Sequence, residues 1–298
     1  MIRILTLVVV VSLARAATAQ GGCWSDAVAV EAKGGQFLSS SALQPADLTA
    51  KIDGKPVSIS SVEPEGDKTA VVILIDGTGS MVDTSSMEFE LARGIVAALP
   101  PAQPTMIVAF AEHSAVVASD RAEAAKWLQT ITGLKKGQRR TALWDAIDKT
   151  VSTISSPHPI FIVLSDGEDN LSKVHADVVM RKLQQSDVRM IWVEIRSDRP
   201  MTEEETQAAE EIAHIAATTG GFAIRSAHEF SRSSYIGQAK LAADAVGAYY
   251  HVRFDLPLDV PGTDKLKIGL ASNKRELKGA HLVYRERLHE CSSQPASH

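Results

Sequence analysis

The stretch that decides the fold is Val71-Val72-Ile73-Leu74-Ile75-Asp76-Gly77-Thr78-Gly79-Ser80-Met81. Its first five residues are aliphatic without interruption, which is typical of a parallel strand buried on both faces. Such a strand has no face for a charge, yet it ends in Asp76 and two hydroxyl residues, Thr78 and Ser80. Open α/β sheets bind ligands at the carboxyl ends of their strands. The stretch therefore predicts a binding site at the end of a buried strand.

Two further segments carry oxygen ligands at the ends of predicted elements. Asp166 follows a second apolar run, Ile160–Ser165, and Thr141 lies just before an amphipathic helix that begins near Leu143. Carboxylate and hydroxyl oxygens, without Cys or His, suit a hard cation. Mg²⁺ is the expected ion, with Mn²⁺ or Ca²⁺ as alternatives.

The segment from Val71 to about Arg225 alternates strands and helices, which predicts an α/β fold with a doubly wound, mostly parallel sheet. The connection between residues 110 and 115 is short, so we expect one antiparallel edge strand after it. The expected strands are Val71–Asp76, Thr105–Phe110, Ala115–Ser119, Ile160–Ser165, Arg189–Ile195 and Gly221–Arg225. Apolar stripes predict the helices between them, including one marked by Val174, Val178 and Leu183 and one opened by a capping box at Thr202.

The two flanks of this segment alternate apolar and polar residues over 26–62 and 249–286, which is typical of strands. Asp53-Gly54 predicts a hairpin turn in the first flank. We expect both flanks to build one small β-rich region. The predicted division is a leader at 1–19, a β-rich flank at 20–68, the α/β domain at 69–247 and a second β-rich flank at 248–298.

Residues 1–19 have a basic start, an apolar core and a small-residue cleavage pattern, as secretory signal peptides do. We therefore expect export to the periplasm, the cell surface or the medium, with no membrane span after the leader is removed. Removal takes away Arg3 and Arg15 and changes the net charge from −5 to −7. A mildly acidic exported chain does not suggest nucleic-acid binding.

The two cysteines, Cys23 and Cys291, lie near the two ends of the mature chain. In an oxidising compartment, a disulfide between them is the expected arrangement. Lipidation of Cys23 is the alternative, because a cysteine follows the leader, although no aliphatic lipobox residue precedes it.

The order of these segments resembles the von Willebrand factor A (VWA) fold, which is Rossmann-like, and its metal-ion-dependent adhesion site. The matching pieces are Asp76-x-Thr78-x-Ser80, a loop threonine at Thr141, and Asp166 in Leu-Ser-Asp-Gly-Glu-Asp-Asn. Over roughly residues 40–290, the chain is similar to exported bacterial VWFA-related proteins, which also carry an Asp-Gly-Lys-x-Val hairpin and a β-rich tail.

The resemblance implies a role for each of these residues. Thr78 and Ser80 would bind the cation through their hydroxyls, and Thr141 would bind it directly or through water. Asp76 and Asp166 would hold coordinated waters and supply negative charge. An acidic side chain of a protein partner would complete the coordination. The implied function is cation-dependent protein binding, without enzymatic activity.

The chain departs from the family pattern beside Thr141, where Arg139-Arg140 replaces the usual glycines. These arginines, with Glu168 and Asp169, form the predicted partner-binding rim, since basic residues attract acidic partners. Thr78 also replaces the more common serine.

Each motif has a plainer structural interpretation. Thr141 is also a possible helix N-cap, Asp-Gly a turn, and the hydroxyls local hydrogen-bonding groups. A VWA module with a degenerate site is therefore one alternative function. An exported metal-assisted hydrolase that uses the same aspartates is another. Ser165 and Asp166 are adjacent on a predicted strand, so we expect their side chains to point to opposite faces.

Overall fold

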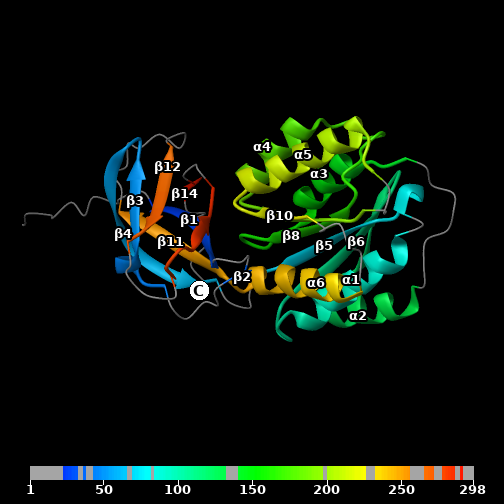
Figure 1. Cartoon of the computed structure of the whole chain (residues 1–298), viewed down its shortest axis with the longest axis horizontal. Coiled ribbons are helices and arrows are strands. Elements are labelled where there is room, and N and C mark those ends of the chain that lie inside the picture. Colours follow the sequence, from blue (N-terminus) through cyan, green and yellow to red (C-terminus); the bar gives the residue numbers. More distant parts are fainter. Residues whose placement is uncertain are drawn as a thin grey trace, which may run out of the picture.

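The computed structural model describes residues 23–32, 36–37, 43–65, 69–81, 84–131, 140–196, 200–225, 232–255, 265–271, 277–285 and 289–290. These residues form two β-sheets that lie side by side along the longest axis of the molecule (Figure 1). The helices gather around one sheet, which we call the α/β unit, and the other sheet is the β unit. The predicted leader lies outside the described residues. Within the described ranges, every helix is too short or too polar to cross a membrane.

The sheet of the α/β unit has six strands in the order β10-β9-β8-β5-β6-β7. Neighbouring strands are parallel except β6 and β7, which are antiparallel. The predicted α/β class, mostly parallel sheet and antiparallel edge strand are therefore confirmed, and each strand bound lies within one residue of its prediction. The strands are β5 (Val71–Asp76), β6 (Thr105–Phe110), β7 (Ser114–Ala118), β8 (Ile160–Ser165), β9 (Arg189–Glu194) and β10 (Phe222–Ile224).

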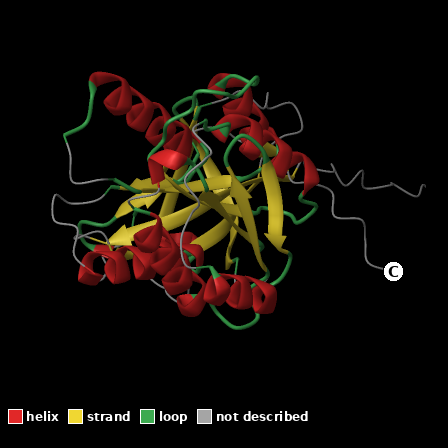
Figure 2. Ribbon diagram, turned by 90° about the vertical axis from the view of Figure 1, so that its right-hand side faces the viewer, coloured by secondary structure: helices red, strands yellow, loops and turns green. Residues whose placement is uncertain are grey.

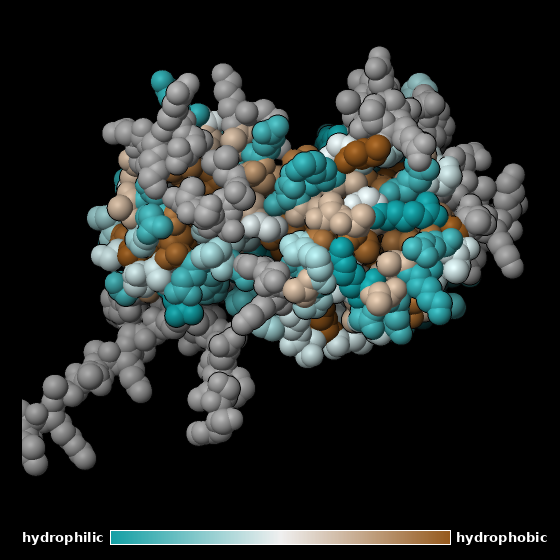
Figure 3. Space-filling view, turned by 90° about the horizontal axis from the view of Figure 1, so that it is seen from below, coloured by the Kyte–Doolittle hydropathy of each residue, from teal (hydrophilic) through white to brown (hydrophobic). Residues whose placement is uncertain are grey.

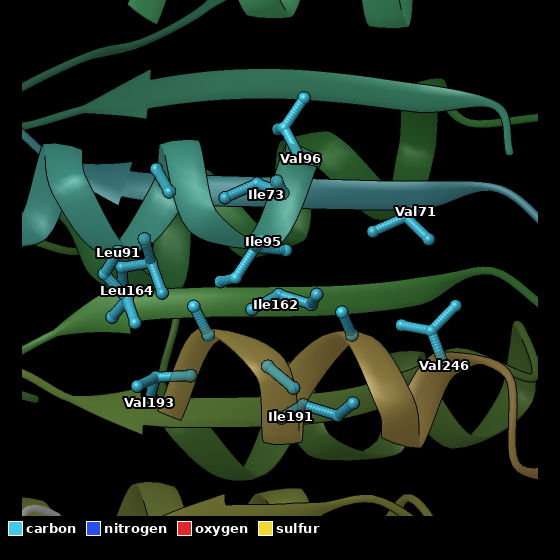
Figure 4. Close-up of a cluster of buried hydrophobic side chains, with 14 of the residues drawn as sticks. Val71, Ile73, Leu91, Ile95, Val96, Ile162, Leu164, Ile191, Val193 and Val246 are labelled. Carbon is cyan, nitrogen blue, oxygen red and sulfur yellow. The ribbon is translucent and has the colours of Figure 1, made fainter. Parts of the chain in front are cut away.

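Helices cover this sheet on both faces, as Figure 2 shows. Alternate residues of β5 face the two helical layers, so Ile73 packs towards one layer and Leu74 towards the other. On the first face, Ile73, Ile162 and Ile191 pack with Leu91 and Ile95 (Figure 4). Each such side chain stabilises the fold by about 1.5–3 kcal/mol when it is buried. This two-sided burial explains why β5 and β8 are apolar along their length.

The helices are α1 (Ser85–Ala98), α2 (Arg121–Thr130), α3 (Leu143–Thr153), α4 (Ala176–Gln185), α5 (Glu203–Thr218) and α6 (Arg232–Val246). α5 begins at the predicted capping box, where the Thr202 hydroxyl accepts a hydrogen bond from the Glu205 N–H at 3.2 Å. The predicted apolar stripe of α4 is wrong at one position. Val178 is 41% exposed, and the helix buries Val179 instead.

The β unit is an antiparallel sheet of eight strands, larger than the small region predicted. Its main order is β12-β3-β4-β11-β1-β13, and β2 and β14 also pair with β1. The predicted Asp53-Gly54 turn joins β3 to β4, and both of its residues have positive φ. The strands are β1 (Cys23–Ala32), β2 (Gln36–Phe37), β3 (Leu48–Ile52), β4 (Lys55–Pro64), β11 (Tyr249–Asp255), β12 (Leu266–Leu270), β13 (His281–Val283) and β14 (His289–Glu290).

The α/β unit is connected to the β unit through two adjacent strands. β4 precedes it, β11 follows it, and these two strands are antiparallel neighbours with Tyr250 opposite Pro64. The Glu65 N–H donates a hydrogen bond to the Tyr249 carbonyl at 3.0 Å. The chain therefore enters and leaves the α/β unit at one point.

Buried charges join the two units at the amino ends of the parallel strands. Arg189, at the start of β9, is fully buried and forms an ion pair with Glu65 at 2.6 Å. Its guanidinium lies over the Tyr249 ring, 4.4 Å from the centroid. It also donates to the His158 carbonyl at 2.6 Å. Glu65 and Tyr249 come from the connections to the β unit, so this arginine links the two sheets.

A second arginine extends this network. Arg285, which follows β13, is buried and pairs with Asp26 of β1 at 3.2 Å and with Asp187 before β9. Asp187 also pairs with His158. Burial alone would raise the pKa of Asp187, but the His158 hydrogen bond and the Arg285 charge outweigh it, and the pKa is lowered. The charges of the two units are thus matched where they meet.

We predict that Arg189→Met destabilises the protein by about 3–5 kcal/mol, because Glu65 would stay buried without its partner. Urea unfolding would measure the loss, and adding Glu65→Gln should recover part of it. Lys240→Met, which removes an exposed i,i+4 pair with Asp244, is the control and should cost less than about 1 kcal/mol. Equal losses for the two single variants would contradict the prediction.

Candidate functional site

The site is built around Asp76 at the carboxyl end of β5, whose side chain is completely buried. Its Oδ1 accepts a hydrogen bond from the Thr78 N–H at 3.0 Å. Its Oδ2 accepts one from the Ser165 hydroxyl of β8 at 2.8 Å. These bonds fix the carboxylate between the ends of the two central strands.

The two hydroxyls that follow Asp76 lie together. Thr78 Oγ1 and Ser80 Oγ are 3.0 Å apart, with Thr78 buried and Ser80 exposed. The half-buried Asp166 carboxyl, which follows β8, lies close enough to the Ser80 hydroxyl for that hydroxyl to oppose the rise that burial causes in its pKa. The structure therefore brings Asp76, Thr78, Ser80 and Asp166 to one edge of the sheet.

Thr141 is held beside the loop that Asp166 begins. Its N–H donates to the Asn170 side-chain oxygen at 2.9 Å, and its carbonyl accepts from the Asn170 and Leu171 N–H groups at 3.0 Å each. The N-cap residue of α3 is Ala142, so the N-cap interpretation of Thr141 is wrong. Thr141 is buried, and its hydroxyl forms no hydrogen bond with the other candidate ligands, all of which the structure describes.

The predicted rim residues lie in different settings. Arg140 is exposed, whereas Arg139 lies outside the described residues. Asp169 accepts hydrogen bonds from the Leu143 N–H at 2.8 Å and the Ser172 hydroxyl at 2.6 Å, so it anchors the start of α3. Glu168 is half-buried, and its N–H donates to Asp166 Oδ1 at 3.0 Å. A role for these residues in partner binding stays a prediction.

Two residues of the site are not identified from the sequence, Ser165 and Glu88. The Ser165 hydroxyl contacts Asp76, and Asp166 follows the end of β8, so the expectation that these two side chains point to opposite faces stays a prediction. Glu88 of α1 is fully buried, and its Oε1 accepts the Asp76 N–H at 2.9 Å. Its spacing to Leu91 and Ile95, on the apolar face of α1, is the signal that could have identified it.

Three acidic side chains gather at this edge of the sheet. Burial, and then the charge of Asp166, raises the pKa of Asp76 to about 7. Burial also raises the pKa of Asp166, and burial together with the charge of Asp76 raises that of Glu88 well above its usual range. Within the described ranges, none of these three carboxyls pairs with a lysine or arginine. A divalent cation would relieve this repulsion.

The donor set fits a hard cation better than a soft one. The described residues contain no group of three or more His, Cys, Asp or Glu side chains arranged to hold a metal ion. The candidate ligands are instead two carboxylates and three hydroxyls, a mixture that suits Mg²⁺ with its retained waters.

One family model matches this chain. A model of the family described as "VWA domain containing CoxE-like protein" matches residues 48–230. The comparison with curated proteins found no match.

Several solved structures are similar to this chain at low identity. BatB from Bacteroides thetaiotaomicron, a conserved hypothetical protein, is 18% identical over 59% of this chain and 98% of that chain, with a TM-score of 0.45. The von Willebrand factor type A protein from Catenulispora acidiphila is 14% identical, over 90% and 74%, with a TM-score of 0.47. The manganese-loaded TRAP protein of Plasmodium vivax is 12% identical, over 80% and 96%, with a TM-score of 0.43. These likenesses do not bear on what this chain binds.

We predict that Ser165→Ala destabilises the protein by about 1–3 kcal/mol, because its hydroxyl bonds both Asp76 and the Gly167 N–H in a buried setting. Urea unfolding in EDTA would measure the change. Thr130→Val removes an exposed hydroxyl from α2 and should change stability by less than about 0.5 kcal/mol. A Ser165→Ala variant as stable as this control would show that the hydroxyl does not hold Asp76.

Proposed function

Because the chain belongs to the family of VWA domain containing CoxE-like proteins, we propose that it is a protein-binding module that depends on a divalent cation. The observation that carries the proposal is the edge where Asp76, Thr78, Ser80 and Asp166 meet with no compensating basic group among the residues that the structure describes. The VWA family supports a protein-interaction role, and the oxygen-only donor set supports the cation.

The proposed ion is Mg²⁺, with Mn²⁺ or Ca²⁺ as alternatives. Thr78 and Ser80 would bind it through their hydroxyls, and Thr141 would do so directly or through water. Asp76 and Asp166 would hold its waters. The bound ion would supply an electrophilic position for a carboxylate from a protein partner. The exposed hydroxyl of Ser80 and the exposed Arg140 are consistent with a partner approaching from this edge.

The proposal includes no enzymatic step. Binding a partner's carboxylate requires only the ion and an accessible edge, whereas a metal-assisted hydrolase also needs a positioned general base. The hydrolase therefore stays the alternative function, and ester or phosphoester turnover that disappears in Asp166→Ala would support it.

The doubly wound topology, export and the disulfide belong to the same proposal. A doubly wound topology is supported by the apolar clusters on the two faces of the parallel sheet. Export and the Cys23–Cys291 disulfide concern residues outside the described set, since Cys291 and the side chain of Cys23 are not described. The disulfide stays a proposal that rests on the two cysteines of the sequence, one near each end of the mature chain.

We predict that the thermal unfolding midpoint of the chain rises when Mg²⁺ or Mn²⁺ replaces EDTA. A cation that binds only the native state at 100 times its Kd stabilises it by about 2.7 kcal/mol. Asp166→Ala should abolish the rise, and Asp177→Ala, an exposed carboxylate on α4, should leave it intact. No rise in the wild-type chain with Mg²⁺, Mn²⁺ or Ca²⁺ would contradict the proposal and favour a degenerate site.

We also predict that the chain captures partner proteins in Mg²⁺ but not in EDTA, and that free glutamate at high concentration competes for the site.

Labelling of thiols before and after reduction would test the disulfide in the same preparation, with no free thiol expected before reduction.

A further inference from the structure

Thr141 is the candidate cation ligand whose position its own segment explains least. It is only 1% exposed, although Arg140 before it is exposed. The N-cap residue of α3, Ala142, forms no side-chain hydrogen bond. The Ala142 N–H donates to the Ala111 carbonyl at 2.8 Å, which fixes the residue after Thr141 rather than Thr141 itself. Contacts from another segment must therefore hold this threonine.

Asn170 holds the backbone of Thr141 through both of its polar groups. The Asn170 side-chain oxygen accepts a hydrogen bond from the Thr141 N–H at 2.9 Å. The Asn170 N–H donates to the Thr141 carbonyl at 3.0 Å, and the Leu171 N–H donates to the same carbonyl at 3.0 Å. The point from which the Thr141 hydroxyl extends is therefore set by the loop that follows Asp166.

The same loop also holds the first residues of α3. Asp169 accepts a hydrogen bond from the Leu143 N–H at 2.8 Å. The Ser172 hydroxyl accepts one from the Asp145 N–H at 3.0 Å. The two loops that carry candidate ligands are therefore joined as one unit.

A buried backbone N–H needs a hydrogen-bond partner, so satisfying the Thr141 N–H is the plainer role for Asn170. Metal ligands, however, are oriented by the groups that hydrogen-bond behind them, and the loss of such a group weakens metal binding. Both roles use the same hydrogen bond. They differ in whether the affinity for a cation depends on that bond through the Thr141 hydroxyl.

We infer that Asn170 is a positioning residue of the cation site, which directs the Thr141 hydroxyl towards the ion by holding the Thr141 backbone. The inference rests on the proposed function. Without the side-chain amide, the loop that carries Thr141 loses one of its fixed points, and its hydroxyl contributes less to binding. The effect of Asn170 on the affinity for the cation should therefore require the Thr141 hydroxyl.

The experiment is calorimetric titration with MnCl₂ of four forms of the purified chain: the wild type, Asn170→Ala, Thr141→Ala and the double variant. Each single variant should bind Mn²⁺ more weakly, and Asn170→Ala should lose about 10-fold, the lower end of the usual effect of altering a group that orients a metal ligand. In the Thr141→Ala background, the same change of Asn170 should alter the affinity by less than about twofold, because the hydroxyl that it positions is gone.

Gln184→Ala is the matched control, since it removes another hydrogen bond from a side-chain amide to the backbone, between α4 and the Thr218 carbonyl. It should bind Mn²⁺ like the wild type. Thermal unfolding in EDTA would show that each variant is folded before titration. Asn170 is exposed, so its truncation leaves no buried cavity. If Asn170→Ala does not fold, Asn170→Leu, which has a similar shape without the acceptor, takes its place with the same expectations.

An Asn170→Ala variant that binds Mn²⁺ as tightly as the wild type would overturn the inference and leave the proposed function standing. So would an equal loss with and without the Thr141 hydroxyl, or a Thr141→Ala variant of wild-type affinity. A wild-type chain that binds no Mn²⁺ would overturn the proposed function, and the inference with it.

Discussion

Burial of β5 and β8 on both faces is the constraint on which the rest of this structure depends. A strand with helices on both sides can carry a polar side chain only where it ends, so the charged residues of these strands are confined to the two edges of the sheet where strands begin and end. Asp76 and Asp166 stand at the carboxyl edge, and Arg189 stands at the amino edge. The position of the candidate site follows from this confinement.

Buried charges are arranged differently at the two edges of the sheet. At the amino edge, Arg189 and Arg285 meet Glu65, Asp26 and Asp187, so each buried charge has a partner of the opposite sign. At the carboxyl edge, Asp76 and Glu88 are buried together, and neither has a basic partner in the described part of the chain. The first arrangement fits a permanent joint between two units, and the second fits a place that an ion from solution completes. Seen from below, apolar residues are scattered among hydrophilic ones (Figure 3). Residues of α1 and α6 line a pocket between these two helices.

The sequence was sufficient to predict the elements whose signals are local. Continuous aliphatic runs located β5 and β8, and the aspartates after them located the edge that the structure brings together. Glu88 and Ser165 were missed because their roles depend on contacts between distant segments, such as the bond from Ser165 to Asp76. The size of the β unit was underestimated because β2 and β14, of two residues each, are too short to give an alternating pattern. The roles of Thr141 and Arg139 in binding stay predictions.

The chain enters and leaves the α/β unit at two points that lie side by side, where the Glu65 N–H bonds the Tyr249 carbonyl. This closeness bears on how the molecule arose. β4 and β11 are adjacent strands, and a short turn could join them directly. The α/β unit occupies the place of that turn, and its two ends lie close together, the geometry that makes insertion of one folded unit into another tolerable. The architecture is that of a β-hairpin with a second domain inserted between its two strands. A single insertion of coding sequence could have produced it while leaving the β-sheet continuous.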